Sequence, residues 1–262
     1  MELKSIRAFI LDMDGVLWRS GEAIGDLPAI FERLQQDGRK VAFATNNSST
    51  TVQGYVDKLN GFGLSVEPWQ IFTSAKATAE YLQNNYPEGS RMHVLGEQGL
   101  RDTLTDHGFE IDNLKPDAVV AGIDRHCTYD DLAESALLIR SGVPFIGTNP
   151  DKSFPAPQGQ LPGAGALLAA LEAATDVQPT IIGKPQPTMM LQALEALGTT
   201  ATETLVVGDR LETDIQSGQT AGCHTCLVLS GVTTEEMAAA WQPAPDLTLP
   251  DLNTLSEILV NV

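Results

Sequence analysis

Residues 8–15 of the chain read Ala-Phe-Ile-Leu-Asp-Met-Asp-Gly, and this stretch decides the fold. An apolar run leads directly into two aspartates, Asp12 and Asp14, that are separated by a single residue. A short, continuously apolar run with polar flanks is typical of a strand buried on both faces of a parallel sheet. We therefore predict a strand at Ala8–Leu11, with both carboxylates just beyond its carboxyl end.

The same pattern recurs along the rest of the chain. Further predicted strands are Val41–Ala44, Thr180–Ile182, Leu205–Val207 and Cys226–Leu229. Amphipathic helices separate them: one opens near Pro28 and stops at Gly38, and the next is capped by Ser48 or Ser49. Strands that alternate with helices predict an α/β fold with a doubly wound, mainly parallel, Rossmann-like core.

The middle of the chain repeats this alternation on its own. Its predicted strands are Met92–Leu95, Ala118–Ala121 and Phe145–Ile146, and its predicted helices lie around 98–107, 129–141 and 163–174. We interpret residues 75–178 as a second α/β domain inserted into the first. The core domain would then be discontinuous and comprise residues 1–74 and 179–262.

Polar side chains follow four of the strands predicted for the core domain. Asp12 and Asp14 follow the first, Thr45, Asn46 and Asn47 the second, Lys184 the third, and Asp209 the fourth, with Asp214 five residues further on. In open α/β sheets, ligands bind outside the carboxyl ends of the strands. The sequence therefore predicts that these side chains converge on one site.

Clustered carboxylates repel one another unless a cation neutralises them, and Mg²⁺ prefers oxygen ligands from one or two carboxylates. Asp12 and Asp209 are the expected side-chain ligands, and the backbone carbonyl of Asp14 is the expected third. With its charge neutralised, Asp12 can attack phosphorus and form an aspartyl phosphate. Asp14 is then the general acid for the leaving alcohol and afterwards the base for water.

The charge of the phosphoryl oxygens needs donors of its own. The ammonium of Lys184, the hydroxyl of Thr45 and backbone N–H groups around Asn46 are suited to hold these oxygens. Asp214, expected in the first turn of the following helix, is predicted to orient Lys184 or a metal-bound water rather than to contact substrate.

Four segments carry a resemblance to a known family: DMDGVLW, ATNNSS, GKPQP and GDRLETDI. They are similar to the four signature segments of the haloacid dehalogenase superfamily, and the set most resembles its NagD and 4-nitrophenylphosphatase branch. The resemblance implies that Asp12 is the nucleophile and Asp14 the acid/base. It also implies phosphate binding by Thr45, Asn46, Asn47 and Lys184, and magnesium binding by Asp12, Asp14 and Asp209.

The same resemblance makes the insert a large α/β cap that selects the substrate. The implied activity is magnesium-dependent hydrolysis of small phosphomonoesters such as sugar phosphates, phosphoglycolate or nucleotides, with 4-nitrophenyl phosphate as a substrate in vitro. Asn149 or Asp151 is expected near the leaving group, the alternative being a role in a turn. Arg210 and Thr213 are expected to border the phosphate, the alternative for Arg210 being a surface ion pair.

The charge and the apolar content of the sequence indicate which partners the protein is expected to bind. The net charge of -18 repels phosphate backbones, so a small phosphorylated metabolite is expected rather than nucleic acid or an anionic membrane. No apolar run approaches the ~20 residues that span a bilayer, and the first ten residues lack a signal peptide's cleavage pattern, which predicts a cytoplasmic protein. The resemblance implies a possible homodimer.

Two other classes of function remain open from the residues alone. Receiver domains of signalling proteins also gather acids, a threonine and a lysine around a phosphoacceptor aspartate, but their acid pair precedes the acceptor and they need no insert of about 100 residues. A non-catalytic ligand-binding protein on the same fold is disfavoured because no catalytic position is missing.

Overall fold

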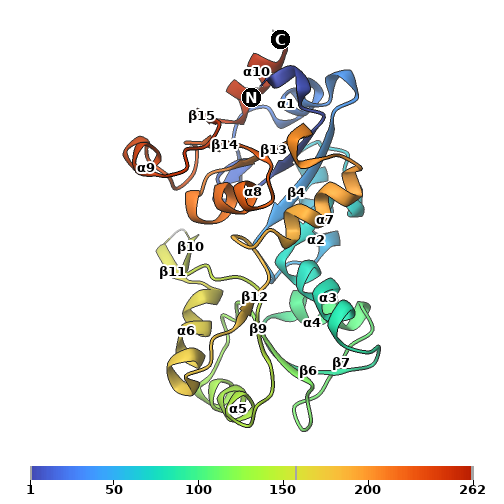
Figure 1. Ribbon diagram of the computed structural model, residues 1–262, viewed down its shortest axis with the longest axis vertical. Coiled ribbons are helices and arrows are strands. Elements are labelled where there is room, and N and C mark those ends of the chain that lie inside the picture. Colours follow the sequence, from blue (N-terminus) through green and yellow to red (C-terminus); the bar gives the residue numbers. More distant parts are fainter. Residues whose placement is uncertain (1, 157, 261–262) are drawn as a thin grey trace. The chain divides into compact units, whose positions relative to one another are not determined.

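The computed structural model describes residues 2–156 and 158–260, and the chain divides into two compact units (Figure 1). Unit 1 comprises Met1–Thr45, Gln53–Phe72 and Lys184–Val262, and unit 2 comprises Asn46–Val52 and Thr73–Gly183. Among the described residues, no helix combines the length and the apolar character needed to cross a bilayer.

Unit 1 is built on a six-stranded sheet in the order β15-β14-β13-β1-β4-β5. The neighbouring pairs from β15 to β4 are all parallel. β1 is completely buried, which agrees with its uninterrupted apolar sequence. The strands are β1 (Ala8–Leu11), β4 (Lys40–Thr45), β5 (Ile71–Thr73), β13 (Thr204–Gly208), β14 (His224–Val228) and β15 (Leu247–Leu249), and a separate hairpin pairs β2 (Trp18–Arg19) with β3 (Glu22–Ala23).

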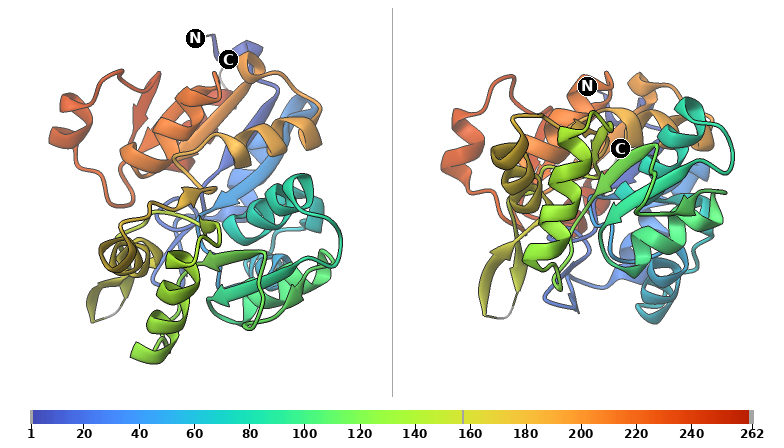
Figure 2. Two further views of the ribbon diagram at one scale, coloured as in Figure 1. Left: turned by 60° about the horizontal axis from the view of Figure 1, so that its bottom comes forward. Right: turned by 90° about the horizontal axis from the view of Figure 1, so that it is seen from below.

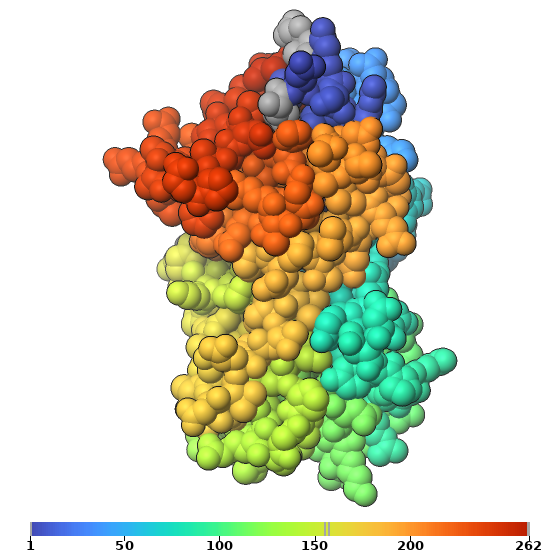
Figure 3. All heavy atoms as spheres, viewed as in Figure 1, coloured from blue at the N-terminus to red at the C-terminus, as the bar shows by residue number. Residues whose placement is uncertain are grey.

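Helices cover this sheet. They are α1 (Leu27–Leu34), α2 (Val52–Gly61), α7 (Thr188–Leu197), α8 (Gln216–Thr220), α9 (Glu235–Ala240) and α10 (Leu252–Val260). α1 packs against α10, α7 against β1 and β4, and α8 against β14. The segments from α7 to the C-terminal helix form a continuous part of the surface of unit 1 (Figure 3, orange to red). The predicted α/β class with a mainly parallel, Rossmann-like core is confirmed.

Unit 2 has its own parallel five-stranded sheet, in the order β12-β9-β8-β6-β7. Its strands are β6 (Arg91–Leu95), β7 (Glu110–Ile111), β8 (Ala118–Ala121), β9 (Phe145–Gly147) and β12 (Thr180–Ile181), and a hairpin adds β10 (Ser153–Ala156) and β11 (Gly159–Pro162). Its helices are α3 (Ser74–Asn85), α4 (Gln98–Asp106), α5 (Tyr129–Arg140) and α6 (Ala164–Thr175). α3 packs with α4, and α5 packs with α6 (Figure 2). The core beneath α5 and α6 includes Val119, Phe145 and Leu168.

The strand at residues 180–181 corrects one prediction. The strand Thr180–Ile182 was predicted in the sheet of the core domain, but Thr180 and Ile181 pair with Ile146 and Gly147 of β9 in the sheet of unit 2. A run of three apolar or β-branched residues carries no information about which of two parallel sheets it joins. Lys184 therefore enters unit 1 from the sheet of unit 2 and does not follow a strand of the unit 1 sheet.

Two helix boundaries were also predicted wrongly. The first helix ends at Leu34 rather than at Gly38, because a short 3-10 turn over Gln36–Gly38 contains Asp37 with φ of 58°. The next helix begins at Val52, so neither Ser48 nor Ser49 caps it. The strands β5 and β15 and the helix α3 were not predicted, since their sequences are short or only weakly periodic.

Candidate active site

Three carboxylates of unit 1 meet at the carboxyl ends of two adjacent strands. Asp12 follows β1, and its N–H donates to the carbonyl of Val207 in β13 at 2.8 Å, which continues the ladder by one residue. Asp209 follows β13, and Asp214 lies in a π-helical turn, Leu211–Ile215, that leads into α8. One oxygen from each of the three carboxylates lies within 4.8 Å of the others.

Lys184 provides the positive charge within this acidic group. Its side chain is 3% exposed, and its Nζ donates to Asp12 Oδ1 and Asp214 Oδ1, both at 2.6 Å. A third hydrogen bond, of 2.9 Å, reaches the backbone carbonyl of Ala44 in β4. The three donors of the ammonium therefore have three acceptors, which fixes it between the two carboxylates.

Burial has the largest single effect on the pKa values in this group. Burial raises the pKa of Asp12 well above its usual range despite the opposing charge of Lys184. Burial, with the nearby charge of Asp214, raises the pKa of Asp209 to about 7. For Lys184, burial lowers the pKa, but the charges of Asp12 and Asp214 outweigh it and the net pKa is raised. One lysine thus compensates only part of the charge of these acids, and the group favours a further cation.

Two glycines leave the space in which Asp209 lies. A Cβ at Gly231 would come within 1.8 Å of Asp209 Oδ2, and a Cβ at Gly15, where φ is +87°, would come within 2.5 Å of the same oxygen. The backbone N–H of Val232 donates to Asp209 Oδ2 at 2.8 Å. This fixes the orientation of the carboxylate, and a larger side chain at either glycine would displace it.

Asp14 lies outside this group of carboxylates. It is exposed, and its Oδ1 accepts a hydrogen bond of 2.7 Å from the indole Nε1 of Trp18, the first residue of β2. Lys58 Nζ lies 3.7 Å from the centroid of the Trp18 ring; burial lowers the pKa of Lys58, and the charge of Asp14 opposes this shift. The side chain of Asp14 is therefore engaged with Trp18, and the third carboxylate of the acidic group is that of Asp214. The prediction for Asp14 as a ligand concerns its backbone carbonyl and does not depend on this side-chain contact.

The remaining predicted residues divide between the two units. Thr45, Arg210 and Thr213 belong to unit 1, where Thr45 and Thr213 are buried and the backbone N–H of Arg210 donates to Asp214 Oδ2 at 3.0 Å. Asn46, Asn47, Asn149 and Asp151 belong to unit 2 and are described within it.

In unit 2, Asn46 is the centre of a local network. Its Nδ2 donates to Asp151 Oδ1 at 3.0 Å, and its backbone carbonyl accepts from Asn149 Nδ2 at 2.7 Å. The side chain of Asn47 instead accepts from the N–H and hydroxyl of Ser49, which is a turn contact. The network therefore unites Asn46, Asn149 and Asp151, three of the four predicted residues of this unit.

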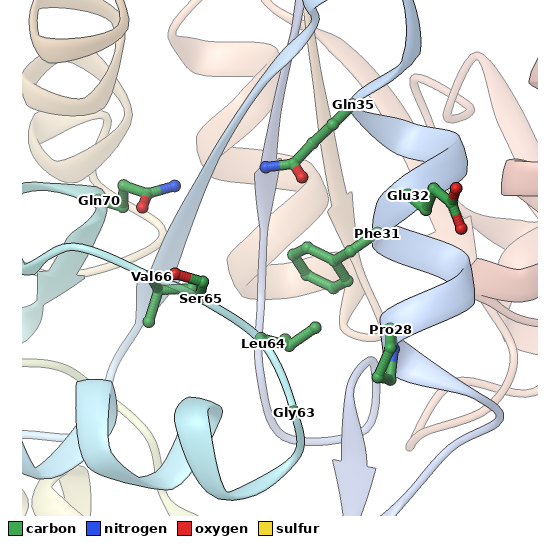
Figure 4. A pocket seen from close by; sticks show the side chains of 9 residues that line it. All are labelled: Pro28, Phe31, Glu32, Gln35, Gly63, Leu64, Ser65, Val66 and Gln70. Atoms are coloured by element: carbon green, nitrogen blue, oxygen red, sulfur yellow. The ribbon is translucent and has the colours of Figure 1, made fainter.

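Unit 1 also contains a cavity of about 280 Å³ (Figure 4). It is lined by Pro28, Phe31, Glu32, Gln35, Gly63, Leu64, Ser65, Val66 and Gln70, and none of these is a predicted site residue.

Comparison with known proteins identifies the family. Residues 9–110 match the family described as haloacid dehalogenase-like hydrolase, and residues 181–255 match the one described as HAD-hydrolase-like. The chain is 39% identical over 234 residues to 5'-nucleotidase YutF of Bacillus subtilis, covering 89% of this chain and 91% of that protein. The chain belongs to the haloacid dehalogenase-like hydrolases.

Other members extend the match over nearly the whole chain. Acid sugar phosphatase of Staphylococcus aureus is 37% identical over 252 residues, or 96% of this chain and 97% of that protein. The structure of 4-nitrophenylphosphatase from Thermotoga maritima has a TM-score of 0.93 at 35% identity and covers 97% of this chain and 98% of that one. The predicted family and branch are confirmed, as is the predicted enzyme class of phosphoric monoester hydrolases.

Three contacts of this haloacid dehalogenase-like hydrolase were not predicted from its sequence. They are the donation from Trp18 to Asp14, the space that Gly15 and Gly231 leave for Asp209, and the N–H donated by Val232. The glycines carried a signal, because each directly follows a polar residue at the end of a predicted strand region. The Trp18 contact carried none, because it depends on an irregular turn.

Proposed function

We propose that the enzyme hydrolyses small phosphomonoesters in the presence of Mg²⁺, through an aspartyl phosphate on Asp12. The observation that carries this proposal is the group formed by Asp12, Asp209 and Asp214, whose oxygens lie within 4.8 Å of one another, with Lys184 Nζ 2.6 Å from two of the carboxylates. The names of the relatives support sugar phosphates and nucleotides as natural substrates and 4-nitrophenyl phosphate as a substrate in vitro. Phosphoglycolate is a further candidate of the same chemistry.

The donor set fits a magnesium ion. Both oxygens of Asp214 are hydrogen-bonded, to Lys184 and to the N–H of Arg210, so we assign it the task of orienting Lys184. Asp209 Oδ2 accepts from Val232, so its Oδ1 is the proposed ligand atom. Asp12 and the backbone carbonyl of Asp14 complete the proposed protein ligands. When bound, the ion would neutralise the carboxylates and polarise a phosphoryl oxygen.

Each of these residues is then proposed to perform a separate task in the reaction. A carboxylate oxygen of Asp12 is proposed to attack phosphorus. Lys184 favours this attack because its hydrogen bond holds the Asp12 side chain in a fixed orientation. Lys184 and Thr45, with Asn46 and Asn47, are proposed to hold the phosphoryl oxygens, because charge spreads over these oxygens during transfer. Asp14 is proposed to protonate the leaving alcohol and then to deprotonate the water that attacks the aspartyl phosphate.

Unit 2 is proposed to act as the cap that selects the substrate, with Asn149 and Asp151 near the leaving group and Arg210 and Thr213 bordering the phosphate. The proposed partner is a small phosphorylated metabolite. The net charge of -18 argues against nucleic acid and anionic membranes, and a homodimer and a cytoplasmic location are further proposals.

Turnover with a panel of phosphorylated metabolites tests the proposed function. Purified protein with Mg²⁺ should release phosphate from 4-nitrophenyl phosphate and from at least one sugar phosphate or nucleotide over many turnovers. EDTA should abolish the release, and added Mg²⁺ should restore it. Phosphorylation that stops at one phosphate per chain would instead indicate a phosphoacceptor protein, and activity that survives EDTA would contradict the proposed metal.

Stabilisation by Mg²⁺ should grow with pH. The pKa of Asp209 is raised from its ordinary value near 4 to about 7, so between these values the metal-free folded state binds more protons than the unfolded chain. The free energy of unfolding of the metal-free protein therefore falls as pH rises through this window. Mg²⁺ replaces the proton, so its binding is favoured above the window.

The measurement is the melting temperature with EDTA and with Mg²⁺, at about pH 5.5 and about pH 8. We expect the rise caused by Mg²⁺ to be larger at the higher pH. In Asp209→Asn, the control variant, the rise should be small at both values. An equal rise at both values in the wild type would show that these carboxylates do not bind the ion.

A further inference from the structure

The hydrogen bond between Trp18 and Asp14 holds the carboxyl proposed as the general acid. Trp18 Nε1 donates to Asp14 Oδ1 at 2.7 Å, and the Trp18 side chain is 1% exposed although Asp14 itself is exposed. The indole ring is buried, and its one polar atom is directed at the carboxyl of Asp14. This hydrogen bond fixes a carboxyl that would otherwise rotate in water. Such a contact positions a side chain at a cost in entropy that the packing of the ring offsets.

The backbone and two neighbouring side chains hold the Trp18 ring in place. The N–H of Gly15 donates to the carbonyl of Trp18 at 2.8 Å, which closes the turn between Asp14 and Trp18. Phe62 stacks on the indole with ring centroids 5.6 Å apart and an interplanar angle of 18°. Lys58 Nζ, 3.7 Å from the ring centroid, makes a cation–π contact. The direction of the N–H is therefore determined by the fold.

The chemistry of the indole determines which oxygen of Asp14 is favoured to carry a proton. An indole N–H only donates, so the Oδ1 that it contacts must act as an acceptor. In the protonated acid, the carbonyl oxygen is the better acceptor, so this hydrogen bond favours Oδ2 as the oxygen that carries the proton. We propose that Trp18 is a positioning residue that holds the Asp14 carboxyl through Oδ1 and leaves Oδ2 directed to the proton transfer; this inference rests on the proposed role of Asp14.

The proton transfers balance in both steps of the reaction. In the first, a bond forms between an Asp12 oxygen and phosphorus, the bond from phosphorus to the alcohol oxygen breaks with its electron pair on that oxygen, and the proton moves to it from Asp14 Oδ2. In the second, a water oxygen bonds to phosphorus, its proton moves to Asp14 Oδ2, and the bond between Asp12 and phosphorus breaks. Oδ1 accepts from Trp18 throughout.

A comparison of substrates with poor and good leaving groups distinguishes an effect on the position of the acid from a general effect on the fold. An alkyl alkoxide is a poor leaving group and needs the proton, whereas 4-nitrophenolate leaves readily without it. Trp18→Phe keeps an aromatic ring for Phe62 and Lys58 but removes the N–H. We expect kcat/KM for an alkyl phosphate to fall about tenfold, the size of one lost hydrogen bond, while kcat/KM for 4-nitrophenyl phosphate stays within about twofold. The ratio kcat/KM is used because it reports the first step and not the second step, in which Asp14 serves both substrates alike.

Two further variants complete the experiment. Trp69→Phe makes the same chemical change at a tryptophan that is 47% exposed, and both activities should be unchanged. In the Asp14→Asn background, Trp18→Phe should cause no additional loss, because a residue that acts only through Asp14 has nothing left to position. If Trp18→Phe lowers the melting temperature strongly, replacement of Trp18 by benzothienylalanine, which has sulfur in place of the N–H, keeps the shape of the ring.

The outcomes are distinguishable. A selective loss on alkyl phosphates that vanishes in the Asp14→Asn background supports the proposal. An equal loss on both substrates, an additive loss in the double variant, or no loss with benzothienylalanine overturns it. If Asp14→Asn itself hydrolyses alkyl phosphates at the wild-type rate, Asp14 is not the acid, and the proposed function fails in that part before Trp18 is considered.

Discussion

Asp12→Asn should lower kcat for 4-nitrophenyl phosphate by at least ~10⁴-fold, the scale seen when a hydrolase loses its nucleophile. An amide cannot form the acyl phosphate, and the loss should be equal for good and poor leaving groups. The variant should remain folded, because asparagine has the shape of aspartate and Lys184 keeps its contacts with Asp214 and the carbonyl of Ala44. Initial rates and the melting temperature are the measurements.

A trapping experiment identifies the intermediate itself. Enzyme quenched with acid during turnover and reduced with borohydride should carry homoserine in place of Asp12, because borohydride reduces an acyl phosphate to the alcohol. Asp106→Asn, a change of the same kind at the exposed end of α4, is the matched control and should retain full activity. Wild-type turnover in Asp12→Asn would overturn the assignment of the nucleophile.

The proximity of Asp12 and Asp209 was predictable because it follows from sheet geometry. Each residue directly follows a buried apolar run, the two strands are adjacent and parallel, and their carboxyl ends necessarily lie at the same edge. Asp214 was expected in the first turn of a helix, and it lies in a π-helical turn over Leu211–Ile215 that precedes α8. Asp214 nevertheless contacts Lys184, because the turn begins at nearly the same position in both geometries.

Lys184 was selected for a reason that the structure corrects. The strand before it, Thr180–Ile181, belongs to the sheet of unit 2, yet the lysine still reaches Asp12 and Asp214. A local apolar pattern predicts that a strand exists but not which sheet it joins, since that choice depends on pairing with residues far away in the chain. The proximity of Lys184 to these carboxylates was therefore predictable from the sequence, but the sheet from which the chain reaches them was not.

Contacts made through irregular backbone could not be predicted from the periodicity of the sequence. Trp18 reaches Asp14 through a turn without helical or strand periodicity, and Gly231 approaches Asp209 from a loop after β14. Periodicity places residues on faces of regular elements, whereas these contacts depend on individual φ and ψ values. They also depend on glycines, which have no Cβ: a Cβ at Gly15 would displace the Asp209 carboxylate.

Lys184→Met should lower kcat/KM by about 10²–10³-fold, the effect of losing one donor to the charge that develops on the phosphoryl oxygens. It should also lower the free energy of unfolding of the metal-free protein by about 3–5 kcal/mol, because Asp12 and Asp214 would lose the cation to which both are hydrogen-bonded. Kinetics at saturating Mg²⁺ and denaturant unfolding with EDTA measure the two effects. Lys40→Met, at a lysine whose Nζ donates to the carbonyl of Leu197, should leave kcat/KM unchanged.

The two consequences of this change should respond differently to the metal. In Lys184→Met the buried acids have lost their lysine, so Mg²⁺ should raise the melting temperature more in this variant than in the wild type. The lost activity should not return together with stability, since a cation held by carboxylates does not supply the hydrogen-bond donors of the ammonium. If saturating Mg²⁺ restores both stability and kcat/KM to wild-type values, then Lys184 only balances the charge of Asp12 and Asp214 and does not bind phosphate.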